Sequence, residues 1–341
     1  MDSLTQIVLG AACGEAALGK KIGNKALLFG AIGGTIPDLD VFVGSWLFGN
    51  EIDAMLFHRG FMHSILFSII GALLFGWITY KLYDTGRRKF STTLHDWVWL
   101  YFLSLFTHPI LDAFTPYGTQ LFAPFSNYRV ALNNIAVVDP IYTVPFLICM
   151  VILMFYKRHS KYRTTWLKVG LVLSTGYLLF TFGNKLYIDT VFKSSLKAEG
   201  ITFSRYFTQP TIFNNVLWYG VVEREDDYYV GYYSLLDSKD QFSDWRQLPK
   251  VRDLQASEFQ RINKMDWFSN GYYTIYRIDD THYKYNDLRY PLSNKNNPNS
   301  SVFSFVLYND NGSLNMKPFQ RNEENVSEAL AELWERLKGK K

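Results

Sequence analysis

Long apolar stretches separated by short polar loops fill the first half of the chain. A helix needs about 20 residues to cross the roughly 30 Å hydrocarbon core of a membrane. Three stretches approach or reach this length without interruption: Met62–Tyr83, Pro140–Tyr156 and Trp166–Leu186. Three others are interrupted by an acid, a histidine or a Pro-Asp step, and are either further spans or buried and re-entrant segments: 4–19, 26–48 and 94–114. The pattern predicts an α-helical membrane domain of about six spans over residues 1–186.

The short loops between these stretches differ in their basic residues. Lysine and arginine accumulate in cytoplasmic loops. With six spans, one side carries twelve of them: Lys20, Lys21, Lys25, Lys81, Arg87, Arg88, Lys89, Lys157, Arg158, Lys161, Arg163 and Lys168. The opposite loops, 49–61 and 115–139, carry only Arg59 and Arg129. We therefore expect the N-terminus and the C-terminal half of the chain to lie outside the cytoplasm.

Beyond Leu186 the pattern changes to short aromatic and β-branched runs. Such runs, separated by acidic or Asn/Gly-rich turns, are typical of strands, and they cover Val216–Val222, Tyr228–Leu236, Tyr272–Ile278 and Val302–Tyr308. The acidic turn 225–227 predicts a hairpin between the first two. Apolar residues at helical spacing in 323–337 predict an amphipathic helix that closes the domain. We predict a soluble, extracytoplasmic, β-rich α+β domain over residues 187–341.

The overall composition conceals this division. The 341 residues are 48% hydrophobic, 17% aromatic and 19% charged, yet only 25 of the 66 charged residues lie in 1–186. That imbalance excludes one uniform domain, and the aromatic content excludes a disordered chain. Cys13 and Cys149 both lie in apolar spans, so neither a disulfide framework nor a thiolate metal site is available. The net charge of +4 comes from loops flanking the membrane and indicates lipid headgroups rather than nucleic acid.

Several ionisable side chains interrupt the apolar stretches, where they are costly and mark either function or a charged partner. Pro37 breaks the second stretch, and the two acids after it would point the same way on an extended turn. A histidine and an acid four residues apart share one face in 94–114. The residues concerned are Asp38, Asp40, His58, His63, His108 and Asp112.

The six-span arrangement puts these six residues at one depth, in the outer leaflet. A single histidine at a membrane interface is more commonly a satisfied side chain, and an acid after a proline often caps a helix, but the shared depth favours a metal site. Imidazole and carboxylate ligands suit zinc, with manganese or iron as alternatives. We predict one or two divalent ions held by the six residues.

Other polar residues at the same depth are candidates for catalysis and substrate binding. Asp2 or Asp40 could serve as general base. Arg59 could clamp a phosphate or carboxylate, or it could pair with Glu51 or Asp53, and both interpretations stay open. The candidates for substrate binding are Gln6, Ser64 and Asp139.

Two features of the first helices predict packing rather than chemistry. Gly10 with Gly14, and Gly30 with Gly34, form small-xxx-small patterns that allow two helices to approach closely. Glu15 lies deeper than the candidate ligands, and we interpret it as a packing residue.

The three polar motifs resemble those of the YdjM-like family of bacterial inner-membrane proteins, described as LexA-binding and as metal-dependent hydrolases. The resemblance covers about 1–186 and is carried by Ile36–Asp40, by His58–Ser64, and by His108–Asp112 continuing through Thr115, Gly118, Leu121 and Pro124. It implies metal ligation by the histidines and aspartates, an inner-membrane location and an inferred hydrolase activity. Relatives often carry histidine where this chain has Gln6, which argues against a ligand from the first helix.

The sequence favours an integral-membrane metal-dependent hydrolase in which an activated water attacks an ester or phosphoester at the outer leaflet. A membrane lipid or a lipid-linked compound is the expected substrate. The alternative is a non-catalytic metal-binding membrane protein, a transporter or a sensor. A transporter should carry ionisable residues through the whole bilayer, whereas here they stop in its outer half apart from Glu15. The sequence leaves the oligomeric state open.

Overall fold

The computed structural model describes residues 1–254, 260–294, 297–310, 312–320 and 323–340. Contacts between residues divide the chain into two units, each described here by itself. The first contains Met1–Gly44 and Phe57–Gly183, and the second contains Ser45–Leu56 and Asn184–Lys341. The second unit therefore includes one segment, 45–56, from the half of the chain that we assigned to the membrane domain.

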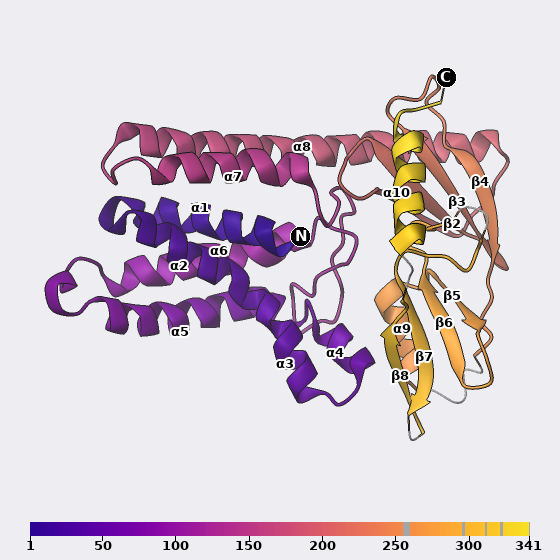
Figure 1. Ribbon diagram of the computed structural model, residues 1–341, viewed down its shortest axis with the longest axis horizontal. Helices are drawn as coiled ribbons and strands as arrows, with labels where there is room; N and C mark the ends of the chain where they lie inside the picture. Colours follow the sequence, from indigo (N-terminus) through magenta and orange to yellow (C-terminus); the bar gives the residue numbers. More distant parts are fainter. Residues whose placement is uncertain (255–259, 295–296, 311, 321–322, 341) are drawn as a thin grey trace. The chain divides into compact units, whose positions relative to one another are not determined.

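The first unit is helical. Its helices and 3-10 turns are α1 (Ser3–Ile22), α2 (Asn24–Thr35), η1 (Ile36–Leu39), the first part of α3 (Asp40–Leu47), η2 (Phe61–His63), α5 (Ile65–Tyr83), η3 (Gly86–Arg88), α6 (Leu94–Asp112), α7 (Pro140–Met154) and the first part of α8 (Lys161–Ala198). Helix α1 packs against α2, α6 and α7, and α6 also packs against α5 (Figure 1).

Three helical segments of the described chain are long and apolar enough to cross a membrane: Asn24–Leu47, Ile65–Tyr83 and Lys161–Ala198. All six stretches that we selected from the sequence contain a helix, but α7, in one of the uninterrupted stretches, has only 15 residues. The first half is thus a helical domain with three candidate spans, and the count of six stays a prediction.

Glycines allow α1 and α2 to approach closely, as their spacing predicts. A Cβ atom on Gly14 would clash with the carbonyl oxygen of Ala26, and one on Gly30 would clash with the carbonyl oxygen of Gly10. Glu15 forms a buried ion pair in which Arg163 Nε of α8 donates to Glu15 Oε1 at 2.7 Å. This contact joins α1 to α8 and fits the packing role that we assigned to Glu15.

Two antiparallel four-stranded sheets form most of the second unit. The first sheet has the order β1 (Arg205–Pro210), β2 (Leu217–Glu223), β3 (Asp227–Ser234), β4 (Ser243–Pro249). The end of α8 covers one face of this sheet, where Phe192 packs with Trp218 and Val222. Tyr219 and Val221 alternate with these residues and enter a core on the other face. The predicted hairpin between β2 and β3 is confirmed.

The second sheet has the order β5 (Tyr273–Arg277), β6 (His282–Asp287), β7 (Ser304–Asp310), β8 (Ser313–Pro318). Helix α9 (Gln260–Ser269) packs against β8. The short helix α4 (Glu51–Phe57) joins this region through Asp53, which pairs with Arg261 Nε at 3.1 Å and with Lys264 Nζ at 2.6 Å.

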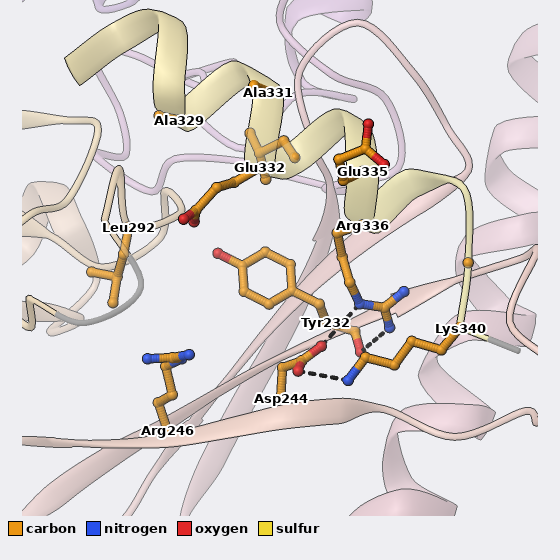
Figure 2. A pocket seen from close by; sticks show the side chains of 12 residues that line it. Tyr232, Asp244, Arg246, Leu292, Ala329, Ala331, Glu332, Glu335, Arg336 and Lys340 are labelled. Carbon is orange, nitrogen blue, oxygen red and sulfur yellow. Dashed lines mark hydrogen bonds and ion pairs between the residues drawn. The ribbon is translucent and has the colours of Figure 1, made fainter. Parts of the chain in front are cut away.

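The predicted C-terminal helix is α10 (Glu323–Leu337). Of the five apolar residues whose spacing predicted it, Leu333 and Leu337 are half-buried, whereas Val326, Leu330 and Trp334 are 43%, 43% and 59% exposed. Arg336 also fixes the helix to the first sheet by ion pairs with Asp237 and Asp244. A pocket of about 580 Å³ lies between α10 and strands β3 and β4 (Figure 2), and none of its lining residues is one of our candidate ligands.

Candidate metal centre

Pro37 sets the geometry of the first two acids. It stands in the first turn of η1, where the lack of an N–H costs no helical hydrogen bond. The predicted extended turn was wrong, because residues 36–39 form a 3-10 turn and Asp40 has the helical angles φ −60° and ψ −25°. Both carboxylates still reach the same histidine: Asp38 Oδ1 lies 3.4 Å from His63 Nε2, and Asp40 Oδ2 lies 3.0 Å from His63 Nδ1.

A tight turn between α4 and α5 presents the second motif. Arg59 has a positive φ of 59°, and its backbone N–H donates to Asp40 Oδ2 at 2.9 Å. His58 Nδ1 lies 2.7 Å from Asp40 Oδ1. Asp40 therefore binds both residues at the start of the turn, and the 3-10 turn that follows places His63 in the fully buried interior.

The third motif lies at the end of α6. His108 and Asp112 are one turn apart, as predicted, and both are buried. His108 Nδ1 lies 2.7 Å from the carbonyl oxygen of Gly34 on α2. Since a carbonyl can only accept, this nitrogen carries the proton, and the lone pair of His108 is on Nε2.

All six predicted ligands come together in two overlapping clusters. Asp38, His63, His108 and Asp112 form one, and Asp40, His58 and His63 form the other; within each, one ligand atom per residue lies within 4.8 Å of the rest. In the first cluster the two histidine Nε2 atoms are 3.1 Å apart. Asp112 Oδ2 lies 3.4 Å from His63 Nε2 and 3.5 Å from His108 Nε2.

The chemistry of the first cluster fits a divalent metal ion. Two imidazole nitrogens and two carboxylate oxygens converge, and among the described residues Asp112 Oδ2 has no hydrogen-bond partner, although Arg59 forms an ion pair with it. Such facing lone pairs repel one another unless a cation lies between them. The other ring nitrogen of His108 donates to the Gly34 carbonyl, as in metal sites where such a group orients a histidine ligand, and that of His63 lies 3.0 Å from Asp40 Oδ2. The cluster could therefore hold a metal ion.

Arg59 is part of this centre rather than of a surface ion pair. Its Nε lies 3.4 Å from Asp112 Oδ2, and its Nη1 donates to Thr115 Oγ1 at 2.8 Å. The alternative pairing with Glu51 or Asp53 is wrong for Asp53, because Arg261 and Lys264 hold that carboxylate. Arg59 is only 4% exposed, and its guanidinium adds positive charge beside the ligands.

The remaining predicted site residues fall into two groups. Gln6 lies at the cluster, where its Nε2 donates to Asp112 Oδ1 at 3.0 Å; the Met1 amine contacts the same oxygen. Asp2, Ser64 and Asp139 instead cap α1, α5 and α7 by accepting backbone N–H groups. Their assigned roles in catalysis and substrate binding stay predictions, and none of the three belongs to either cluster.

Sequence reasoning did not select Tyr117 and Arg129 as site residues. The guanidinium carbons of Arg59 and Arg129 lie 4.8 Å and 5.1 Å from the centre of the Tyr117 ring. Arg129 Nη2 also donates to the carbonyl oxygens of His58 and Gly118, at 3.1 Å and 3.2 Å. The sequence did contain one indication of Arg129: the loops 49–61 and 115–139 carry no lysine or arginine other than Arg59 and Arg129.

Comparison with known proteins gives relatives but no solved structure that matches the chain. The uncharacterized protein YfhP of Bacillus subtilis (strain 168) is 31% identical over 186 residues, which cover 52% of this chain and 53% of that protein. The chain thus spans about half the length of this relative. The inner membrane protein YbcI of Escherichia coli (strain K12) is 34% identical over 132 residues, which cover 35% of this chain and 70% of YbcI.

The family model for the YdjM inner membrane protein matches residues 1–187. The match includes every residue of both histidine–aspartate clusters and confirms the resemblance that the three motifs indicated. Since it covers more than half of the sequence, the chain belongs to the YdjM inner membrane protein family.

Proposed function

We propose that this protein is an integral-membrane hydrolase that depends on a divalent metal ion and cleaves an ester or phosphoester. One observation carries the proposal: the paired Nε2 atoms of His63 and His108 converge with Asp38 and Asp112 inside a helical membrane domain. Buried acids and histidines are rare among apolar helices unless they serve function. Zinc is our first choice of metal because two nitrogen and two oxygen ligands suit it, with manganese or iron as alternatives.

A bound divalent ion would supply Lewis acidity, lowering the pKa of a water molecule and polarising the scissile group. Asp2 or Asp40 is our candidate for the proton acceptor, because Asp38 and Asp112 both serve as ligands of the first cluster. Asp40 lies 3.0 Å from His63 Nδ1 through its Oδ2, and Asp2 caps α1. Arg59 would stabilise negative charge that develops beside Asp112.

We further propose that the site lies at headgroup depth in the outer leaflet of the inner membrane. The twelve basic residues of alternate loops support six spans, with both chain ends outside the cytoplasm. On that topology η1, η2 and the end of α6 share one side of the membrane. A lipid or a lipid-linked compound is then the substrate class that reaches the metal most directly.

The test is hydrolysis by the purified full-length protein in detergent. Phosphate release and fatty-acid release would be measured on a panel of phospholipids and isoprenoid phosphates with zinc, manganese or iron. We expect turnover on at least one substrate, its loss with a chelator, and its loss in His63→Ala but not in His282→Ala, since His282 lies in the second unit. Bound metal without turnover on any substrate would favour the alternative, a non-catalytic metal-binding protein.

A further inference from the structure

We propose that Arg59, Arg129 and Tyr117 form an anion-binding subsite beside the first metal cluster and that this subsite holds a phosphoryl group. The inference rests on the proposed function and narrows its substrate class from esters in general to phosphoryl esters. All three residues belong to the first unit, together with the candidate ligands.

The geometry of the subsite brings two cations to one aromatic ring. Both guanidinium carbons lie about 5 Å from the centre of the Tyr117 ring, so they are at most about 10 Å apart. The His58 ring contacts Tyr117 as well, at a centroid distance of 5.5 Å. Arg59 connects the subsite to the first metal cluster, because its Nε lies 3.4 Å from Asp112 Oδ2.

The charge of the centre favours an anion once metal is present. Asp38, Asp40 and Asp112 carry three negative charges against the two positive charges of Arg59 and Arg129. With neutral histidines, one divalent ion changes the formal charge of these five side chains from minus one to plus one, and a protonated Met1 amine beside Asp112 would add one more positive charge. The low dielectric of a buried site strengthens the attraction for a balancing anion.

Solvent reaches the centre on the side of the proposed subsite. His58 and Asp38 side chains are 22% and 21% exposed, whereas those of His63, His108 and Asp112 are at most 1% exposed. Tyr117 and Arg129 are half-buried like the first two. An anion arriving from solvent therefore meets Arg129, Tyr117 and the partly exposed ligands before Arg59 and the other buried residues.

A phosphoryl group matches this arrangement better than a carboxylate does. Guanidinium groups donate paired N–H bonds to phosphate oxygens in a planar fork. A phosphate monoester offers up to two negative charges and three terminal oxygens, enough acceptors for a guanidinium group and a metal ion at once. A carboxylate offers one charge and two oxygens, and leaves part of this positive charge without a partner.

The experiment measures binding of inorganic phosphate to the full-length, metal-loaded protein by titration calorimetry in a phosphate-free detergent. We expect saturable binding that Arg129→Met weakens about tenfold or more, the effect of losing a charge-assisted hydrogen bond. Metal content is measured on the same samples. Arg88→Met is the matched control, because Arg88 lies 4.5 Å from the centre of the Tyr83 ring, outside both clusters.

A second variant distinguishes a role of Arg129 in phosphate binding from a structural role. The second role is possible because Arg129 also donates hydrogen bonds to two carbonyl oxygens. Arg129→Lys keeps the charge but loses the fork, so we expect phosphate binding between those of the wild type and of Arg129→Met, with unchanged metal content. Loss of metal in both variants would show a structural role and overturn the proposal. Dioctanoyl phosphatidic acid is the second probe: tighter binding than inorganic phosphate points to a lipid source of the phosphoryl group, and equal binding to a soluble source.

Different results would overturn the metal site and the anion-binding subsite. A wild-type protein without stoichiometric metal would overturn the proposed function and the subsite with it. A metal-loaded wild type that does not bind phosphate, or an Arg129→Met variant that binds it as tightly as the wild type, would overturn the subsite alone. An Arg88→Met variant with the same loss as Arg129→Met would also overturn it, because the effect would then be one of overall charge.

Discussion

His63 connects the two clusters through its two ring nitrogens. Nε2 faces His108, Asp38 and Asp112, and Nδ1 lies 3.0 Å from Asp40 Oδ2. A carboxylate behind a histidine ligand fixes the ring and makes the opposite nitrogen a better ligand. Asp40 therefore contributes to the first cluster even when it does not bind its ion.

This arrangement predicts a loss of metal affinity in Asp40→Asn. We expect binding to weaken by about 10- to 100-fold, because an amide orients and polarises His63 less well than a carboxylate does. Competition with a chromogenic chelator would measure the affinity. Asp96→Asn is the control, since Asp96 caps the opposite end of α6. Equal affinities of Asp40→Asn and the wild type would contradict the role given to Asp40.

At the residue scale, the sequence predicted the members of the clusters but not their contacts. His108 and Asp112 could be paired because helical spacing fixes which residues share a face. The Gly34 carbonyl that fixes His108, and the contact of Arg59 with Asp112, join residues far apart in the sequence. Such contacts follow from helix packing, which apolar periodicity does not specify.

The close packing of helices α1 and α2 depends on glycines at the point where the helices cross. Gly14→Val should destabilise the first unit, because its Cβ atom would meet the Ala26 carbonyl and the α2 backbone, which cannot move aside as a flexible side chain can. Unfolding in detergent would measure a lower melting temperature. Gly176→Val on α8 is the control, since a Cβ atom there meets nothing within 4 Å. Equal melting temperatures of the two variants would contradict the close packing.

The attachment of α10 to the first sheet should depend on pH. Burial raises the pKa of Asp237, but hydrogen bonds from Arg336 and from backbone amides outweigh it, so that the pKa lies below its ordinary value. A depressed carboxyl pKa stabilises the folded state above the unfolded pKa of about 4, and this stabilisation is lost as pH falls through the folded value.

Acidification from pH 7 to below the lowered pKa of Asp237 should therefore loosen α10. Hydrogen exchange of its amides, corrected for the intrinsic rates at each pH, should show a loss of protection in the wild type. Arg336→Met should have weak protection at both pH values, because Asp237 has then lost its partner. Unchanged protection of the wild type at low pH would contradict the role of this ion pair.

At the element scale, the sequence predicted those helices and strands whose apolar pattern is strong. The hairpin β2–β3 and the bounds of α10 agree with the expectation. Strands β1, β4, β6 and β8 and helix α9 were missed, because polar residues interrupt the apolar pattern of all five segments. Only part of the apolar pattern of α10 is buried, because ion pairs of Arg336 also hold the helix.

The whole molecule combines a helical unit with a β-rich unit that also contains residues 45–56. The sequence could not assign this segment, because its partners are distant: Asn50 Nδ2 donates to the Leu314 carbonyl, and Asp53 pairs with Arg261 and Lys264. The composition did reveal the two halves, since charged residues concentrate after residue 186.

The proposed topology predicts which side of the membrane each end of the chain occupies. Alkaline phosphatase fused after the last residue should be active, and green fluorescent protein fused there should be dark, because the former folds only outside the cytoplasm. Fusions in the basic loop after Arg88 should give the opposite pair of results. A fluorescent C-terminal fusion would contradict the orientation.

The central claim, that histidine and aspartate side chains of the helical unit hold a divalent metal ion, is tested most directly by elemental analysis. Mass spectrometry of the purified protein should find about one or more divalent ions per chain. His108→Ala should lose the ion, whereas His95→Ala, at the other end of α6, should keep it. A wild type without metal, or a His108→Ala variant with the full content, would contradict the account.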